Sequence, residues 1–152
     1  MSKPEFVYVT YIETTPEKLW EALTDSEFSK RYWFGTEVRS DWKVGSPFAL
    51  VTDGKTSDTG EILEADPPRR LSYTFKHELF EEMREPATKV VFTIEPYGEI
   101  VKLTVTHEGF VDGSKLLGAI SNGWPAILSG LKSLLETGHA PTIRPEALGK
   151  IR

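Results

Sequence analysis

The chain has 152 residues, 39% of them hydrophobic, and contains no cysteine. This length predicts a single domain with a buried core, and the absence of thiols excludes disulfides, thiolate metal sites and cysteine nucleophiles. The formal net charge of −5 comes from 18 basic and 23 acidic residues scattered along the chain, so nucleic acid is not an expected partner.

A strand and two short helices are predicted at the start of the chain. Residues 5–13 are rich in β-branched and aromatic types, which favour a strand. Thr14 or Thr15 can cap a helix whose first turn contains Pro16. A second short helix is predicted over residues 27–32, after the stop and new cap at Asp25-Ser26.

From about residue 36 to 108 the hydrophobic pattern has a period of two, which indicates strands. Turn signals such as Asp53-Gly54 and Tyr97-Gly98 divide this region into six further strands. The predicted apolar faces of three of them are Leu71, Tyr73, Phe75 and His77; Val90, Phe92 and Ile94; and Val101, Leu103, Val105 and His107. One apolar face per strand predicts an antiparallel sheet that is covered on one side.

A long apolar stripe over residues 114–137 predicts the helix that covers this sheet. Its members recur every three or four residues and are Leu116, Leu117, Ile120, Trp124, Ile127, Leu128, Leu131, Leu134 and Leu135. Pro125 has no N–H to donate, so the helix is expected to kink or break there, and Gly138 is expected to end it. The sequence therefore predicts an α+β domain over residues 1–138 and a C-terminal tail over residues 139–152.

Two segments and the tail each allow two interpretations. Residues 77–89 form either a lid over a cavity or a cover for the edge of the sheet. Trp33 and Phe34 either line an entrance or anchor the helix pair. The tail forms an extended arm over the body, or it docks onto a neighbouring subunit through Ile143, Leu148 and Ile151, which leaves a homodimer open.

Several motifs resemble those of one known family: TTPEKLWEALTD, GEILEADPPRRLSYTF, VVFTIEP, KLTVTHEGF and NGWPAILSGLKSLLETG. They are similar to the START/Bet v 1-like (SRPBCC) helix-grip superfamily, and within it to the bacterial branch named after the C-terminal domain of the activator of the heat-shock-protein-90 ATPase. The resemblance implies a helix-grip fold, in which a curved seven-stranded sheet wraps around a long kinked C-terminal helix. It also implies a hydrophobic cavity between sheet and helix, but no shared catalytic set.

The sequence contains no recognisable catalytic motif, and no metal site or cofactor is expected. His77 and His107 are predicted to point inward from strands that have one strand between them, about 10 Å apart and too far to share a metal. Each either contacts a ligand or bonds to backbone or water, whereas His139 is expected in solvent. Asp53-Gly54-Lys55-Thr56 lacks the glycine that a phosphate loop needs, so it is interpreted as a hairpin turn.

Three functions from different classes follow. The first is a binding protein for a small lipid-like or aromatic ligand, with a lining of Tyr73, Phe75, His77, Phe92, His107, Leu116, Ile120 and Trp124. The second is a cyclase or hydrolase that uses the same cavity, and the third is a chaperone-associated module, implied only by the family name. No apolar run approaches the roughly 20 residues of a membrane span and no signal peptide is recognisable, so a cytoplasmic protein is expected.

Overall fold

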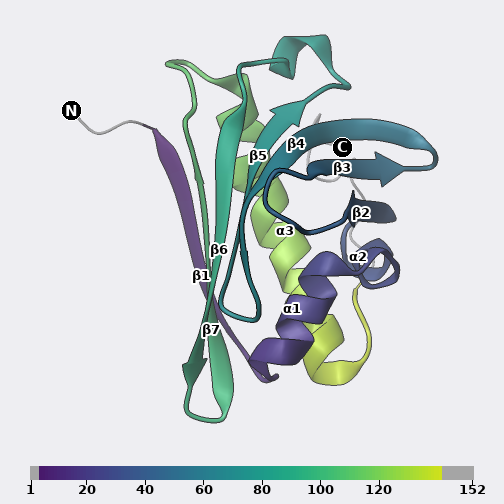
Figure 1. Cartoon of the computed structure of the whole chain (residues 1–152), viewed down its shortest axis with the longest axis vertical. Coiled ribbons are helices and arrows are strands. Elements are labelled where there is room, and N and C mark those ends of the chain that lie inside the picture. The colour runs from purple at the N-terminus through teal and green to yellow at the C-terminus, as the bar shows by residue number, and fades with distance from the viewer. Residues whose placement is uncertain (1–3, 142–152) are drawn as a thin grey trace.

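The structure is a computed structural model that describes residues 4–141 (Figure 1). The tail residues Ile143, Leu148 and Ile151, predicted to lie over the body or to dock onto a neighbour, fall outside the described residues. No helix within residues 4–141 is long and apolar enough to cross a membrane.

Seven antiparallel strands form one sheet, in the order β1-β7-β6-β5-β4-β3-β2. The strands are β1 (Glu5–Ile12), β2 (Thr36–Ser40), β3 (Pro47–Thr52), β4 (Lys55–Asp66), β5 (Arg70–His77), β6 (Thr88–Tyr97) and β7 (Ile100–Glu108). The helices are α1 (Pro16–Thr24), α2 (Ser26–Tyr32) and α3 (Lys115–Thr137), with a 3-10 turn, η1, at Glu81–Met83. All three α-helices lie on the same side of the sheet (Figure 1), which confirms the predicted α+β architecture.

The helix ends follow the predicted capping chemistry. The side chain of Thr15 accepts a hydrogen bond from the backbone N–H of Lys18, and Asp25 accepts from the N–H groups at the start of α2. Ser114 caps α3 in the same way through the N–H of Leu117. Gly138 ends α3 with a φ of 81°, a left-handed conformation that costs glycine nothing.

Pro125 does not break α3, which is continuous from Lys115 to Thr137. A proline inside a helix costs about 3 kcal/mol because it removes one hydrogen bond and crowds the preceding turn. Each large apolar side chain that becomes buried returns about 1.5–3 kcal/mol. Trp124, Ile127 and Leu128 around the proline are all buried, so packing outweighs the local penalty. Of the two predicted outcomes at Pro125, the break is wrong.

The predicted alternation on the sheet is confirmed where it was clearest. On β7 the side chains of Val101, Leu103 and Val105 have no exposed surface, and the residues between them are partly exposed. The β3–β4 connection is the predicted hairpin, because Thr52 pairs with Lys55 across Asp53 and Gly54, both with positive φ. This hairpin forms one border of the site described below.

Gly60 of β4 is the glycine that the packing requires most. A Cβ at this position would overlap the backbone carbonyl oxygen of Thr74 on β5. We therefore expect Gly60→Ala to lower the free energy of unfolding by more than about 2 kcal/mol in a urea titration.

The matched control is Gly118→Ala in α3, where an added Cβ meets nothing within 4 Å. That variant should gain about 0.5–1 kcal/mol, because alanine loses less conformational freedom than glycine in a helix. Similar stabilities for the two variants would contradict the close approach of β4 and β5 at Gly60.

Candidate functional site

A series of hydrogen bonds crosses the core and joins α3 to β7, β6 and β5. The Trp124 indole Nε1 donates to Nδ1 of His107 at 3.1 Å. Nε2 of His107 lies 2.7 Å from Thr88 Oγ1, and the Thr88 hydroxyl donates to the carbonyl oxygen of Phe75 at 2.9 Å. These four groups, the His107 network, are all buried.

The directions of these bonds fix the charge of His107. Because an indole N–H can only donate, Nδ1 of His107 must be an acceptor and carries no proton. Nε2 therefore carries the proton and donates to Thr88, and the imidazole is neutral. Burial also lowers the pKa of His107 to about 3, partly opposed by the negative charge of Asp58. Both ring nitrogens are thus used by the protein at neutral pH.

Aromatic side chains pack around this network. The ring of Phe75 meets His107 edge-on at 5.0 Å, and Phe92 meets Trp124 in the same way at 5.8 Å between ring centroids. Tyr73 lies between Phe92 at 5.7 Å and Phe48, on which it stacks at 3.9 Å. This continuous aromatic packing joins the centre of the sheet to the middle of α3.

A second histidine, His77, forms a separate polar cluster at the end of β5. Its Nδ1 lies 2.8 Å from Oδ1 of Asp58, and its Nε2 accepts the backbone N–H of Phe80 at 3.0 Å. Since a backbone N–H can only donate, Nε2 is unprotonated and Nδ1–H donates to the carboxylate. The Ser57 hydroxyl donates to the other oxygen of Asp58 at 2.7 Å, so the carboxylate, which has no exposed surface, has two side-chain donors.

A β-bulge in β4 brings two polar side chains into this cluster. Leu50 of β3 pairs with Asp58, and Val51 pairs with Thr56, so Ser57 is the extra residue between them. Both Ser57 and Asp58 are buried as a result, although adjacent residues of a regular strand face opposite sides. Asp58 also lies directly opposite His77 in the β4–β5 pairing, which places the two side chains together.

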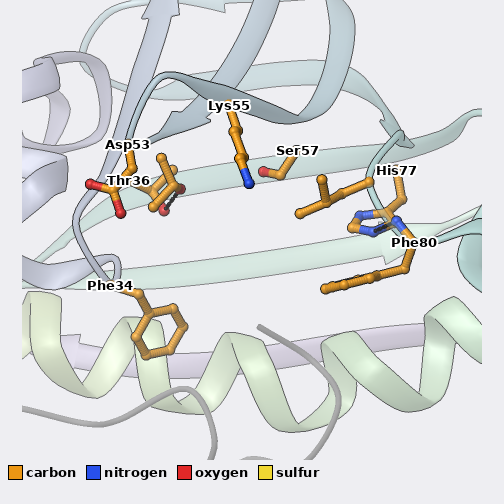
Figure 2. Close-up of a pocket in the computed structure, with 9 residues that line it drawn as sticks. Phe34, Thr36, Asp53, Lys55, Ser57, His77 and Phe80 are labelled. Carbon is orange, nitrogen blue, oxygen red and sulfur yellow. Dashed lines mark hydrogen bonds between the residues drawn. The ribbon is translucent and has the colours of Figure 1, made fainter.

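Next to this cluster lies a pocket of about 270 Å³. Its lining residues come from the turn after α2 and the start of β2, from the β3–β4 hairpin, and from the end of β5 and the segment that follows it. They are Phe34, Thr36, Thr52, Asp53, Lys55, Ser57, His77, Leu79 and Phe80. Figure 2 shows Asp53 and Thr36 at one end and His77 and Phe80 at the other, with Lys55 between them. Lys55 has no ion-pair partner within residues 4–141.

The structure distributes the eight predicted ligand-binding residues over two places. His77 lines the pocket. The other seven are buried in the core: Tyr73, Phe75, Phe92, His107, Leu116, Ile120 and Trp124. His77 and His107 both point inward, as predicted, and β6 lies between their strands. His139 is exposed, also as predicted.

The two segments with two interpretations each contact more than one part of the fold. Leu79 and Phe80 line the pocket, whereas Met83 is buried and Glu85 accepts hydrogen bonds from the N-terminus of α3 at Lys115 and Leu116. Residues 77–89 thus border the pocket and also hold α3 by its first turn. Trp33 and Phe34 divide likewise, because Trp33 is in the core and contacts Trp124 while Phe34 lines the pocket.

Sequence reasoning missed Asp58, Ser57 and Lys55 as site residues. Asp58 falls on an apparently regular strand, and the only available signal was the polar run Lys55 to Thr59 in a chain region otherwise rich in alternating apolar residues. No group of three or more histidine, aspartate or glutamate side chains within residues 4–141 is arranged to hold a metal ion.

The fold and the arrangement of the site define a helix-grip protein, and comparison with known proteins places it in a family. The family model described as "Activator of Hsp90 ATPase homolog 1-like protein" matches residues 13–136. The chain belongs to this family, within the START/Bet v 1-like superfamily. No curated protein matches the chain.

Solved structures with the same fold come from several organisms. Protein MLL2253 from Mesorhizobium loti is 28% identical, with a TM-score of 0.76 over 87% of this chain and 96% of its own. The Aha1 dimer from Colwellia psychrerythraea is 20% identical (TM-score 0.74, 89% and 98%). PFC0360w from Plasmodium falciparum, described as an HSP90 activator, is 24% identical (TM-score 0.72, 86% and 95%). At these identities the last two comparisons establish the fold alone.

The lowered pKa of His107 predicts a specific loss of stability in acid. Between pH 6.5 and about 3 the unfolded chain binds a proton at this residue that the folded protein does not, so stability falls as the pH falls. From pH 6.5 to pH 4.5 this contribution amounts to about 2 kcal/mol. His107→Gln can still accept from Trp124 and donate to Thr88, yet it does not titrate.

Urea titrations at pH 6.5 and 4.5 should therefore show a smaller acid-induced loss of stability for His107→Gln than for the wild type. His139→Gln, at an exposed position, is the control and should keep the wild-type pH dependence. Equal pH dependence in the wild type and in His107→Gln would contradict the buried neutral state of His107.

Proposed function

We propose that the protein binds a small, largely apolar molecule in the pocket between the β3–β4 hairpin and the segment that follows β5. The observation that carries this proposal is the pocket itself, of about 270 Å³, with Phe34, Leu79 and Phe80 as apolar walls. Ligand sites are typically apolar hollows of about 300–1,000 Å³ with a few placed polar groups. The volume here, close to the lower end of that range, favours a compact aromatic or short aliphatic ligand.

The polar groups of the pocket favour a ligand with an uncharged polar end. Lys55 supplies an ammonium, Asp53 supplies a carboxylate, and the buried Asp58 lies directly behind Ser57 and His77. A ligand anion would meet these two carboxylates, and a ligand cation would meet the ammonium. A hydroxyl or amide group can instead donate to Asp53 and accept from Lys55.

The bond between His77 and Phe80 supports a lid role for the adjacent segment. The Phe80 N–H donates to His77, and the two rings stack at 5.5 Å. His77 is in turn held by the buried Asp58, so the apolar side chains of Leu79 and Phe80 are positioned over the pocket by the end of the sheet. In this proposal His77 contacts the ligand with its ring and positions the lid through Nε2, while Asp58 holds its Nδ1.

The other seven predicted residues have an indirect role in this proposal. Their packing fills the centre of the fold, and a ligand reaches Tyr73, Phe75, Phe92, His107, Leu116, Ile120 or Trp124 only by displacing neighbouring side chains. A long lipid-like chain would need such displacement, whereas a compact aromatic ligand would not. The proposal therefore prefers the aromatic class over the lipid-like class.

The alternative functions find less support. A cyclase or hydrolase would use a histidine as acid or base, but both nitrogens of His77 and of His107 are already bonded to protein groups. The chaperone-associated role rests on the family description and on the name of a relative that is 24% identical. A cytoplasmic location and the absence of a nucleic-acid partner stay predictions from composition.

The test is an amide NMR titration of the protein with 1-naphthol, indole and 2-phenylethanol. Binding in the pocket should shift the signals of Ser57, His77, Leu79 and Phe80 for at least one of these compounds. Leu79→Ala should weaken that binding by about fivefold, because the ligand loses roughly 1 kcal/mol of apolar contact.

Leu63→Ala is the matched control, since Leu63 is similarly exposed but does not line the pocket (39% against 44% for Leu79). It should bind as the wild type does. If none of the three compounds shifts the pocket signals, or if Leu79→Ala and Leu63→Ala bind equally, the proposed site is wrong.

A further inference from the structure

Strand β1 lies at one edge of the sheet, and its composition is typical of a strand that has neighbours on both sides. From Phe6 to Ile12 it contains no charge, no glycine and no proline. Three of its side chains are exposed on the outer side of the sheet, Val7 at 52%, Val9 at 45% and Tyr11 at 40%. A long apolar edge is a ready template for another strand, and proteins normally protect such edges.

The opposite edge of the sheet, β2, has that protection. It is only five residues long, and an ion pair joins Arg39 to Glu37 on the strand itself. Short length and charge are the usual means of blocking edge pairing. The contrast points to β1 as the edge that is available for a partner.

A hydrogen bond from α3 shows which backbone groups of β1 point away from the sheet. Lys132 donates from its Nζ to the carbonyl oxygen of Tyr11 at 2.6 Å, so this carbonyl is directed to the free side of the strand. In an antiparallel pair, alternate residues direct both their N–H and C=O groups to the same side. Val7 and Val9 therefore offer their backbone groups to the free edge, and their side chains are exposed.

We propose that β1 pairs with β1 of a second copy of this chain across a two-fold axis. In the antiparallel arrangement Val7 lies opposite Val9 of the second copy, and Val9 lies opposite its Val7. Four backbone hydrogen bonds then form between these residues, and their four side chains make one apolar cluster on the outer side. Tyr8 lies on the axis, opposite Tyr8 of the second copy.

The charges at the ends of β1 fit this arrangement. Glu5 is paired with Glu108 of β7, and like charges in directly opposite positions destabilise a sheet. In the proposed dimer Glu5 faces Tyr11 of the second copy. Tyr11 is itself paired with Lys102 of β7. Lys102 of the second copy therefore lies in the same cross-strand row of side chains as Glu5 and Glu108. A second copy thus supplies the apolar stripe, the free backbone groups and the compensating charge.

The test uses the full chain and two substitutions with matched controls. Sedimentation velocity of the wild type from 5 to 200 µM should show a concentration-dependent shift from the 17.1 kDa monomer toward twice that mass. Val9→Lys should abolish the shift, because it places two ammonium groups in the apolar cluster. Val44→Lys, at a 70% exposed position in the loop before β3, should leave the shift unchanged.

Crosslinking tests the position of the axis. The chain has no cysteine, so Tyr8→Cys introduces a single thiol. Opposite residues of a non-hydrogen-bonded antiparallel pair lie about 4.5 Å apart at Cα, within the range that a disulfide spans. Under oxidised glutathione Tyr8→Cys should form a covalent dimer at least tenfold faster than Val44→Cys.

A wild type that stays monomeric at 200 µM would overturn the proposal. A dimer that survives Val9→Lys, or Tyr8→Cys crosslinking no faster than Val44→Cys, would show that any dimer uses another surface and would overturn it equally. The outcome is independent of ligand binding, because no residue of β1 lines the pocket.

Discussion

The hydrogen bonds that run from Trp124 through His107 and Thr88 to the carbonyl of Phe75 tie the long helix to the centre of the sheet. Buried polar groups are costly unless each is paired, and here each donor in the series has one acceptor. This pairing requires a neutral imidazole, and burial supplies it by lowering the pKa of His107 to about 3. The network thus gives α3 a directional, buried contact with β7, β6 and β5.

The aromatic packing around this network and the pocket occupy different parts of the fold. The rings of Phe75 and Trp124 pack on His107, and Phe92 packs on Trp124, so aromatic side chains fill this part of the core. The described pocket lies beside the β3–β4 hairpin, where Ser57 at the bulge, Leu79 and Phe80 are among its lining residues. In this chain the pocket therefore lies at one end of the sheet and not along the whole of α3.

Much of the fold could be predicted because its signals are local. The alternation on β7 and the three-to-four spacing in α3 each repeat several times. The caps at Thr15 and Asp25 and the stop at Gly138 depend on neighbouring residues only. The outcome at Pro125 could not be predicted, since it depends on burial against elements far away in the sequence. Gly60 gives no sequence signal either, because its requirement comes from a carbonyl on the next strand.

The site was less predictable for a related reason. His77 and His107 were found by alternation, but their partners Asp58 and Thr88 come from neighbouring strands through pairing register. The bulge at Ser57 reverses the expected direction of one side chain, and no pattern in a single sequence marks a bulge of this kind. The family resemblance implied a cavity between sheet and helix, and the structure has a pocket lined in part by the β3–β4 hairpin and by Leu79 and Phe80.

The most direct test of this account is to locate a bound probe by intermolecular nuclear Overhauser effects between unlabelled 1-naphthol and the labelled protein. The account predicts contacts from the probe to the Leu79 methyl groups and to the rings of Phe80 and Phe34. Contacts to the rings of Trp124 and Phe92 instead would contradict it, because they would show that the ligand opens the aromatic core and displaces the packing around His107.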